Sequence, residues 1–205
     1  MEELEMLGAQ PPKERADAAR NRRKVLAAAA RLFAEKGVES VSMDAVAAAA
    51  GVGKGTLFRR FGDKSGLAAA LLDERERDLQ QRILSGSPPL GPGAPARDRL
   101  AAFFAAYLEY VLGHLDLVRM SETASPGARF RIGAYRFWHR HVAILLAEAR
   151  PDADAEPLSH ALLAAVSAEV AGVLRAEYGA GRAAATVTCL VESVSHQPRL
   201  THGRR

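Results

Sequence analysis

Residues 42–64 read SMDAVAAAAGVGKGTLFRRFGDK, and this stretch decides the fold of the first part of the chain. Ser42 is a suitable N-cap, because its hydroxyl can accept a hydrogen bond from a free backbone N–H of a helix beginning at Met43. Gly51 suits the end of that helix, since a residue without Cβ enters the left-handed region at little cost. Small and apolar residues at helical spacing predict one buried face, made of Met43, Val46, Ala47 and Ala50.

A second short helix is expected from about Gly53. The side chains of Val52, Leu57 and Phe61 should face inward. The residues left on the solvent side are cationic, hydroxylated or without a side chain, namely Lys54, Gly55, Thr56, Arg59 and Arg60. Two short helices joined by a glycine turn, with such a surface on the second, are typical of a helix-turn-helix that binds DNA.

The stretch resembles the DNA-binding domain of the tetracycline-repressor (TetR) family of bacterial transcription regulators. The resemblance covers roughly residues 20–80, which is under half of the chain. The matching segments are Leu32-Phe33-Ala34-Glu35-Lys36-Gly37, Ala50-Gly51-Val52, Lys54-Gly55-Thr56-Leu57-Phe58, Phe61 and Lys64. Three positions depart from the family's pattern: Gly53 replaces a common serine, Phe58 a common tyrosine, and Arg60 a frequent histidine.

The resemblance implies a set of DNA contacts. Lys54, Gly55 and Thr56 are expected at base edges, which carry the sequence information. Contacts with phosphates or with the DNA surface are expected from Ser42, Gly53, Phe58, Arg59, Arg60 and Lys64. The charge distribution agrees, because residues 20–64 hold ten Lys and Arg against four Asp and Glu, whereas the rest of the chain holds 18 against 20.

The 205 residues suit a small DNA-binding domain followed by a larger helical one. Residues 1–19 are expected to be a disordered extension, 20–82 the helix-turn-helix domain with its reading motif at about 43–62, and 196–205 a flexible tail. The stretch 85–95 is a proline-rich linker, and 97–195 should form the second domain. Because no segment has the pattern of a strand, the predicted fold is all-α, with helices at about 63–84, 97–112, 115–122, 128–150, 157–178 and 182–195.

By the resemblance, the second domain binds a small hydrophobic or aromatic ligand and dimerises. The candidate ligand-binding side chains are mostly aromatic: Phe103, Tyr107, Tyr110, Met120, Phe130, Tyr135 and Trp138. Taken singly, each of these residue types is more often an ordinary core residue than a ligand contact. A homodimer through about 157–195 would place two reading helices on a palindromic operator, from which ligand binding releases the protein as a repressor.

Other functions have less support in the sequence. Gly51–Thr56 resembles a phosphate-binding loop, but Ala48 and Gly55 occupy positions where that motif needs glycine and Ser or Thr. His139 and His141 lie two apart, so on a helix they point to different sides and predict no metal site. Cys189, the one cysteine, is expected to be a small buried residue. We expect no cofactor, no enzymatic activity, no membrane segment and a cytoplasmic location; the alternative is an enzyme or helical binding module in which the helix-turn-helix is only structural.

Overall fold

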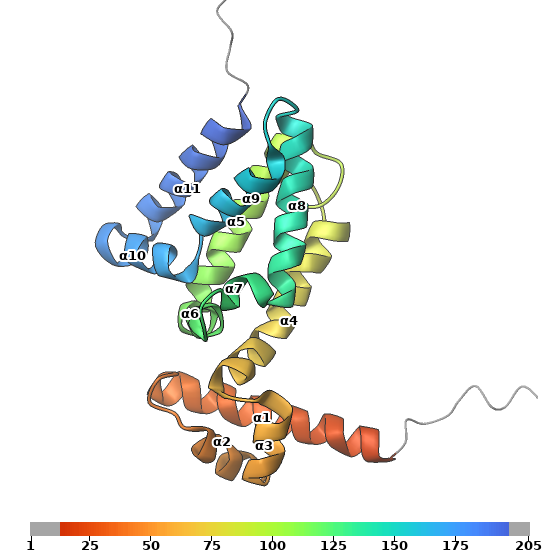
Figure 1. Ribbon diagram of the computed structural model, residues 1–205, viewed down its shortest axis with the longest axis vertical. Helices are drawn as coiled ribbons and strands as arrows, with labels where there is room; N and C mark the ends of the chain where they lie inside the picture. Colours follow the sequence, from red (N-terminus) through yellow and green to blue (C-terminus); the bar gives the residue numbers. More distant parts are fainter. Residues whose placement is uncertain (1–12, 197–205) are drawn as a thin grey trace, which may run out of the picture. The chain divides into compact units, whose positions relative to one another are not determined.

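The computed structural model describes residues 13–196, and helices account for all of the regular secondary structure in this range. The predicted all-α fold is confirmed. The chain divides into two compact units, with the boundary between Leu71 and Leu72 (Figure 1).

The first unit contains three helices and the start of a fourth. They are α1 (Lys13–Lys36), α2 (Met43–Ala50), α3 (Lys54–Phe61) and the first two turns of α4 (Lys64–Ser85). The core of this unit lies under α1, which packs against α2. Its fully buried side chains include Ala29, Val46, Leu57, Leu67 and Ala68.

The N-terminal helix is longer than the sequence prediction. Helix α1 is described from Lys13, so residues 13–19 are helical and the predicted extension over 1–19 is wrong for these positions. The segment KERADAAR explains the difference, because Ala, Glu, Lys and Arg are strong helix formers and neither Gly nor Pro interrupts them. Residues 1–12, and 197–205 of the predicted tail, lie outside the described range. Gly37 ends α1 with a φ of 77°.

Helix α4 runs through the boundary between the two units. The sequence placed the end of the first domain near residue 82, but the division falls eleven residues earlier, after Leu71. Leu72, Leu79 and Ile83 belong to the hydrophobic core of the second unit, which explains the earlier boundary. At its start α4 is capped by Asp63, whose carboxylate accepts a hydrogen bond of 2.9 Å from the backbone N–H of Gly66.

The second unit is a layered bundle (Figure 1) in which α5 packs against α8 and α11. Its core is rich in aromatic rings: Phe103 stacks on Tyr107 with centroids 5.5 Å apart, and Tyr107 lies 5.5 Å from Trp138. The helices that follow α4 are α5 (Ala96–Gly113), α6 (Leu115–Thr123), α7 (Ala128–Arg131), α8 (Gly133–Ala149), α9 (Ala155–Ala164), α10 (Ala168–Tyr178) and α11 (Ala180–Ser195).

Two helices that the sequence predicted as continuous are each broken. The predicted helix 128–150 divides into α7 and α8 because Ile132, with φ −64° and ψ 129°, is extended. The predicted helix 157–178 divides into α9 and α10, and Ser167 starts the second part by accepting a hydrogen bond from the backbone N–H of Val170. Serine is unfavourable inside a helix but favourable at its start, so Ser167 is a sequence signal for the second break.

Within residues 13–196 no single helix is long and apolar enough to cross a membrane, although two sharply bent pairs, α5 with α6 and α9 with α10, pass the same test when joined.

Candidate nucleic-acid interface

The turn between α2 and α3 has the geometry that its sequence predicts. Ser42 Oγ accepts a hydrogen bond of 3.1 Å from the backbone N–H of Ala45 and so caps α2. Gly51 adopts the left-handed conformation, with φ 64° and ψ 37°, and ends the helix. Gly53 is the N-cap of α3 and offers no side chain for capping, so the first turn of α3 has free backbone N–H groups.

Helix α3 has one buried and one exposed side. Leu57 is 1% exposed and anchors the helix, whereas Phe58 is 39% exposed. A Cβ built on Gly55 would meet no atom within 4 Å, so the backbone there is open to a large partner. The predicted outward set is exposed as expected and consists of Lys54, Gly55, Thr56, Arg59 and Arg60.

Lys54 is held by an acidic residue of the preceding helix. Its Nζ lies 2.6 Å from Oδ2 of Asp44, and both side chains are more than half exposed. This pair fixes the ammonium at the start of α3. Asp44 was not predicted to be part of the site; the available signal was that Asp44 and Lys54 lie in the first turns of the two helices of the motif.

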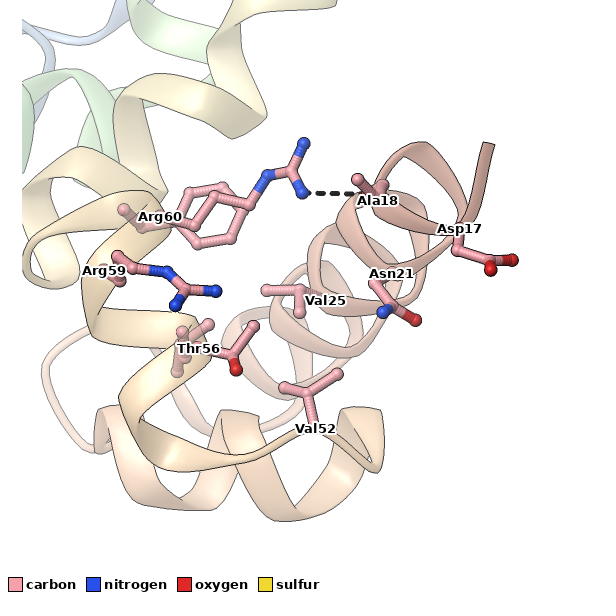
Figure 2. Close-up of a pocket in the computed structure, with 10 residues that line it drawn as sticks. Asp17, Ala18, Asn21, Val25, Val52, Thr56, Arg59 and Arg60 are labelled. Carbon is pink, nitrogen blue, oxygen red and sulfur yellow. Dashed lines mark hydrogen bonds between the residues drawn. The ribbon is translucent and has the colours of Figure 1, made fainter. Parts of the chain in front are cut away.

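A groove of about 290 Å³ runs between α1 and α3 (Figure 2). We call it the α1–α3 groove, and its polar walls are formed by Asp17, Asn21, Thr56, Arg59 and Arg60, over an apolar floor that includes Val25 and Val52. Arg60 Nη1 crosses the groove and donates a hydrogen bond of 2.9 Å to the carbonyl oxygen of Ala18. Asn21 was not among the predicted site residues, because its place beside α3 depends on how α1 packs and not on the local sequence.

Lys64 has a role inside the unit. Its side chain is 26% exposed, and Nζ donates hydrogen bonds of 3.0 Å to the carbonyl oxygens of Val38 and Glu39. These bonds tie the start of α4 to the loop between α1 and α2. The predicted phosphate contact would compete with both bonds, so the geometry favours a structural role for this lysine.

The predicted ligand-binding residues lie in different surroundings. Phe103, Tyr107 and Trp138 are at most 3% exposed and pack on one another in the core. The hydroxyl of Tyr110 donates a hydrogen bond of 3.0 Å to Glu76 Oε1, and Met120 is half-buried on α6. Phe130 and Tyr135 line one cavity, which has a volume of about 430 Å³.

The outer helices also differ in part from the predicted dimer face. Leu162, Val166, Val187 and Val191 are buried in the core of their own unit. Large apolar side chains remain exposed on α10 and α11, namely Val170, Val173, Tyr178 and Leu190. Cys189 is exposed, contrary to the prediction, because the buried side of α11 is set by Ala183, Val187 and Val191 at four-residue spacing.

With this geometry established, comparison with known proteins decides the family of the first unit. Residues 25–71 match the model of bacterial regulatory proteins of the tetR family. This segment belongs to the tetR family. An HTH-type transcriptional regulator of Staphylococcus aureus is 45% identical over 69 residues, which are 34% of this chain and 36% of that protein. The chain therefore spans about a third of the length of the curated relative it matches.

Solved tetR-family structures resemble nearly the whole chain in fold. A regulator from Pectobacterium atrosepticum has a TM-score of 0.63 at 22% identity, covering 88% of this chain and 94% of its own. Thermus thermophilus FadR, a tetR-family repressor in complex with lauroyl-CoA, has a TM-score of 0.64 at 17% identity. The match covers 90% of this chain and 99% of FadR. These relatives are regulators and not enzymes, and at such identities the likeness of the solved structures establishes the fold alone.

Proposed function

We propose that the protein is a transcriptional regulator that binds a palindromic operator as a homodimer. The observation that carries the proposal is the outward side of α3, where Lys54, Thr56 and Arg59 surround the open backbone of Gly55. The fold and charge of the first unit match those of helix-turn-helix domains, whose second helix lies in the major groove. Binding to DNA in the cytoplasm follows from this proposal.

The exposed side chains divide by chemistry into two kinds of DNA contact. Lys54, Gly55 and Thr56 begin α3, and the start of a recognition helix contacts base edges. Arg59, the hydroxyl of Ser42 and the free N–H groups after Gly53 would bind phosphates, with Phe58 packed on the sugar. Arg60 supports the interface through its bond to Ala18, and Lys64 supports it through the loop carbonyls.

Dimer formation is supported by the apolar side chains that α10 and α11 leave exposed. Val173 is 52% and Val170 41% exposed on the same helix, and Leu190 is 37% exposed on α11, which packs against α10. Burial of apolar surface is the main favourable term in protein association. A second copy related by a two-fold axis would cover this face with an identical one.

A small molecule would control DNA binding by favouring one arrangement of the dimer. The neighbouring structures include FadR with lauroyl-CoA and a regulator from Saccharomonospora viridis with choline, which supports a ligand for the second unit. Because α4 is shared by both units, a change in the second unit could alter the spacing of the two α3 helices. The coupling free energy between two such binding sites is typically about 1–3 kcal/mol. If ligand binding releases the protein from DNA, the protein acts as a repressor.

Footprinting on the DNA upstream of the protein's own gene tests this function. The expected result is protection of two symmetric half-sites, with dimers in sedimentation experiments. As a control for the dimer, Val173→Glu should give monomers with weakened DNA binding and unchanged helix content, because Val173 lies outside the buried core. Failure to protect any upstream DNA at low salt would overturn the proposal.

A further inference from the structure

The second unit contains a cavity whose walls combine aromatic rings with positive charge. It has a volume of about 430 Å³, within the range of about 300–1,000 Å³ that is typical of small-molecule sites. We call it the α8–α9 pocket. Its lining residues are Phe130, Tyr135, Arg136, His139, Arg140 and His160, contributed by α7, α8 and α9.

The rings of the pocket form a connected stack. The imidazoles of His139 and His160 lie with their centroids 3.9 Å apart, at an interplanar angle of 29°. The Tyr135 hydroxyl lies 2.7 Å from His160 Nδ1, within hydrogen-bonding distance. Phe130 stands edge-on to both Tyr135 and His160 and is 56% exposed. An exposed phenyl ring at the mouth of a stack can pack on another flat ring.

Of the two arginine side chains that line the pocket, one is available to bind a ligand. Arg140 Nη1 lies 3.3 Å from Oε1 of Glu156, so that these two charges are paired. In the part of the chain that the structure describes, Arg136 forms no hydrogen bond or ion pair, although it lines the same pocket. Arg136, Arg140 and Glu156 together carry a net charge of +1, which matches a monoanion.

The histidines have no third partner that would make them a metal site. His139 Nε2 lies 3.6 Å from Glu156 Oε2, yet across residues 13–196 no three His, Cys, Asp or Glu side chains are arranged to hold a metal ion. Burial lowers the pKa of His160, and the neighbouring His139 lowers it further, against an opposing effect of Glu156. The pair is therefore best suited to stacking and hydrogen bonding.

We propose that the α8–α9 pocket binds a small aromatic monocarboxylate. The aromatic ring would pack against Phe130 and the imidazole stack, and the carboxylate would accept hydrogen bonds from Arg136, with Arg140 beside it. An aliphatic acid would lack the ring contacts, and a neutral aromatic molecule would leave Arg136 unused. Binding of the carboxylate at this pocket needs only the second unit. Any effect of that binding on the affinity for DNA rests on the proposed function.

Calorimetry with 2-naphthoate tests the site directly, with 2-naphthamide as the uncharged probe of the same shape. The full-length protein should bind the acid and bind the amide about tenfold or more weakly, because a charge-assisted hydrogen bond is lost. Arg136→Ala should weaken the binding of 2-naphthoate by a similar factor. Arg75→Ala removes the same charge from an exposed position on α4 outside the pocket lining and should leave affinity within about twofold.

A second variant should increase affinity, which a folding defect cannot imitate. Glu156→Gln removes the negative charge at the rim and releases Arg140, while the backbone carbonyl of residue 156 still accepts the hydrogen bond of 2.7 Å from Ser159 Oγ. We expect 2-naphthoate to bind several-fold more tightly to this variant. Equal or weaker binding to Glu156→Gln, equal binding of the amide and the acid, or no effect of Arg136→Ala would each overturn the assignment of the site.

The two proposals fail separately. If the protein protects its upstream DNA but does not bind 2-naphthoate at millimolar concentration, the pocket assignment is wrong and the regulator proposal stands. If it binds 2-naphthoate through Arg136 and protects no DNA, the pocket assignment stands and the regulator proposal is wrong.

Discussion

Lys54 Nζ lies 2.6 Å from Oδ2 of Asp44, so the first residue of the recognition helix is paired with a carboxylate of the helix before it. The pair places the ammonium at the end of α3 that would enter the major groove. It also places a negative charge where phosphates would approach. Asp44 is therefore expected to orient Lys54 at some expense of overall DNA affinity.

Replacing Asp44 by Asn should strengthen DNA binding. The amide removes the negative charge and frees Lys54, and an exposed ion pair of this kind is worth about 0.2–1 kcal/mol, so the affinity per half-site should rise by roughly 1.4-fold to fivefold. Titration of labelled upstream DNA measures this. Glu35→Gln removes an exposed carboxylate from the last turn of α1 and serves as the control; a gain equal to that of Asp44→Asn would show that only net charge matters.

Thr56→Ala should change which DNA sequences are preferred. Thr56 is exposed and directly follows Gly55, whose backbone is open, and loss of a contact to a base edge costs about 1–3 kcal/mol at that base pair. Selection from a randomised pool of operators should show relaxed preference at one or two positions in each half-site. A sequence profile identical to that of the unaltered protein would remove Thr56 from the base-reading set.

Lys64→Met should destabilise the first unit. The substitution keeps the length of the side chain but removes the donor to the carbonyl oxygens of Val38 and Glu39, at a cost of about 1–3 kcal/mol. Urea unfolding followed by circular dichroism gives the free energy of unfolding. Lys36→Met, at an exposed position at the end of α1, should change it little. If the two variants were equally stable while only Lys64→Met lost DNA binding, Lys64 would contact DNA directly.

Glu76→Gln should stabilise the second unit at neutral pH. Burial raises the pKa of Glu76 above its ordinary value of 4.5, against an opposing effect of the hydrogen bond from Tyr110, while the charge of Asp73 raises it further. A carboxyl whose pKa is raised in the folded state stabilises the fold when protonated, below pH 4.5. It loses that contribution as the pH rises through the folded-state pKa.

Glutamine retains an acceptor for the Tyr110 hydroxyl and does not titrate, so its advantage should appear only as the pH rises. The Tm of Glu76→Gln should exceed that of the unaltered protein at pH 7, and the difference should shrink toward pH 4.5. Glu74→Gln, on the exposed side of α4, is the matched control. An equal difference at both pH values would show that ionisation of Glu76 is not its cause.

The sequence predicted the helix-turn-helix closely because its signals are local. Ser42, Gly51 and Leu57 each act within one or two helical turns, through a cap, a left-handed glycine and a single buried anchor. The same holds for Asp63 at the start of α4. Such features depend on neighbours in the sequence and need no knowledge of how helices pack.

The relationships that the sequence did not predict join distant residues. The bond from Arg60 to Ala18 spans 42 positions, and the bonds of Lys64 join α4 to the loop between α1 and α2. The stack of His139 on His160 depends on how α8 lies against α9. Spacing along one helix shows which side a residue faces but does not show what it meets, which is why two of the predicted ligand-binding residues line a pocket and three form core.

The salt dependence of DNA binding, measured for the unaltered protein and for Arg59→Ala on the DNA upstream of the gene, tests most directly whether α3 is the DNA-binding surface. The unaltered protein should lose affinity steeply as salt rises, and Arg59→Ala should bind all sequences more weakly with a slope reduced by about one for each half-site. Equal slopes and equal affinities for the two proteins would contradict the account.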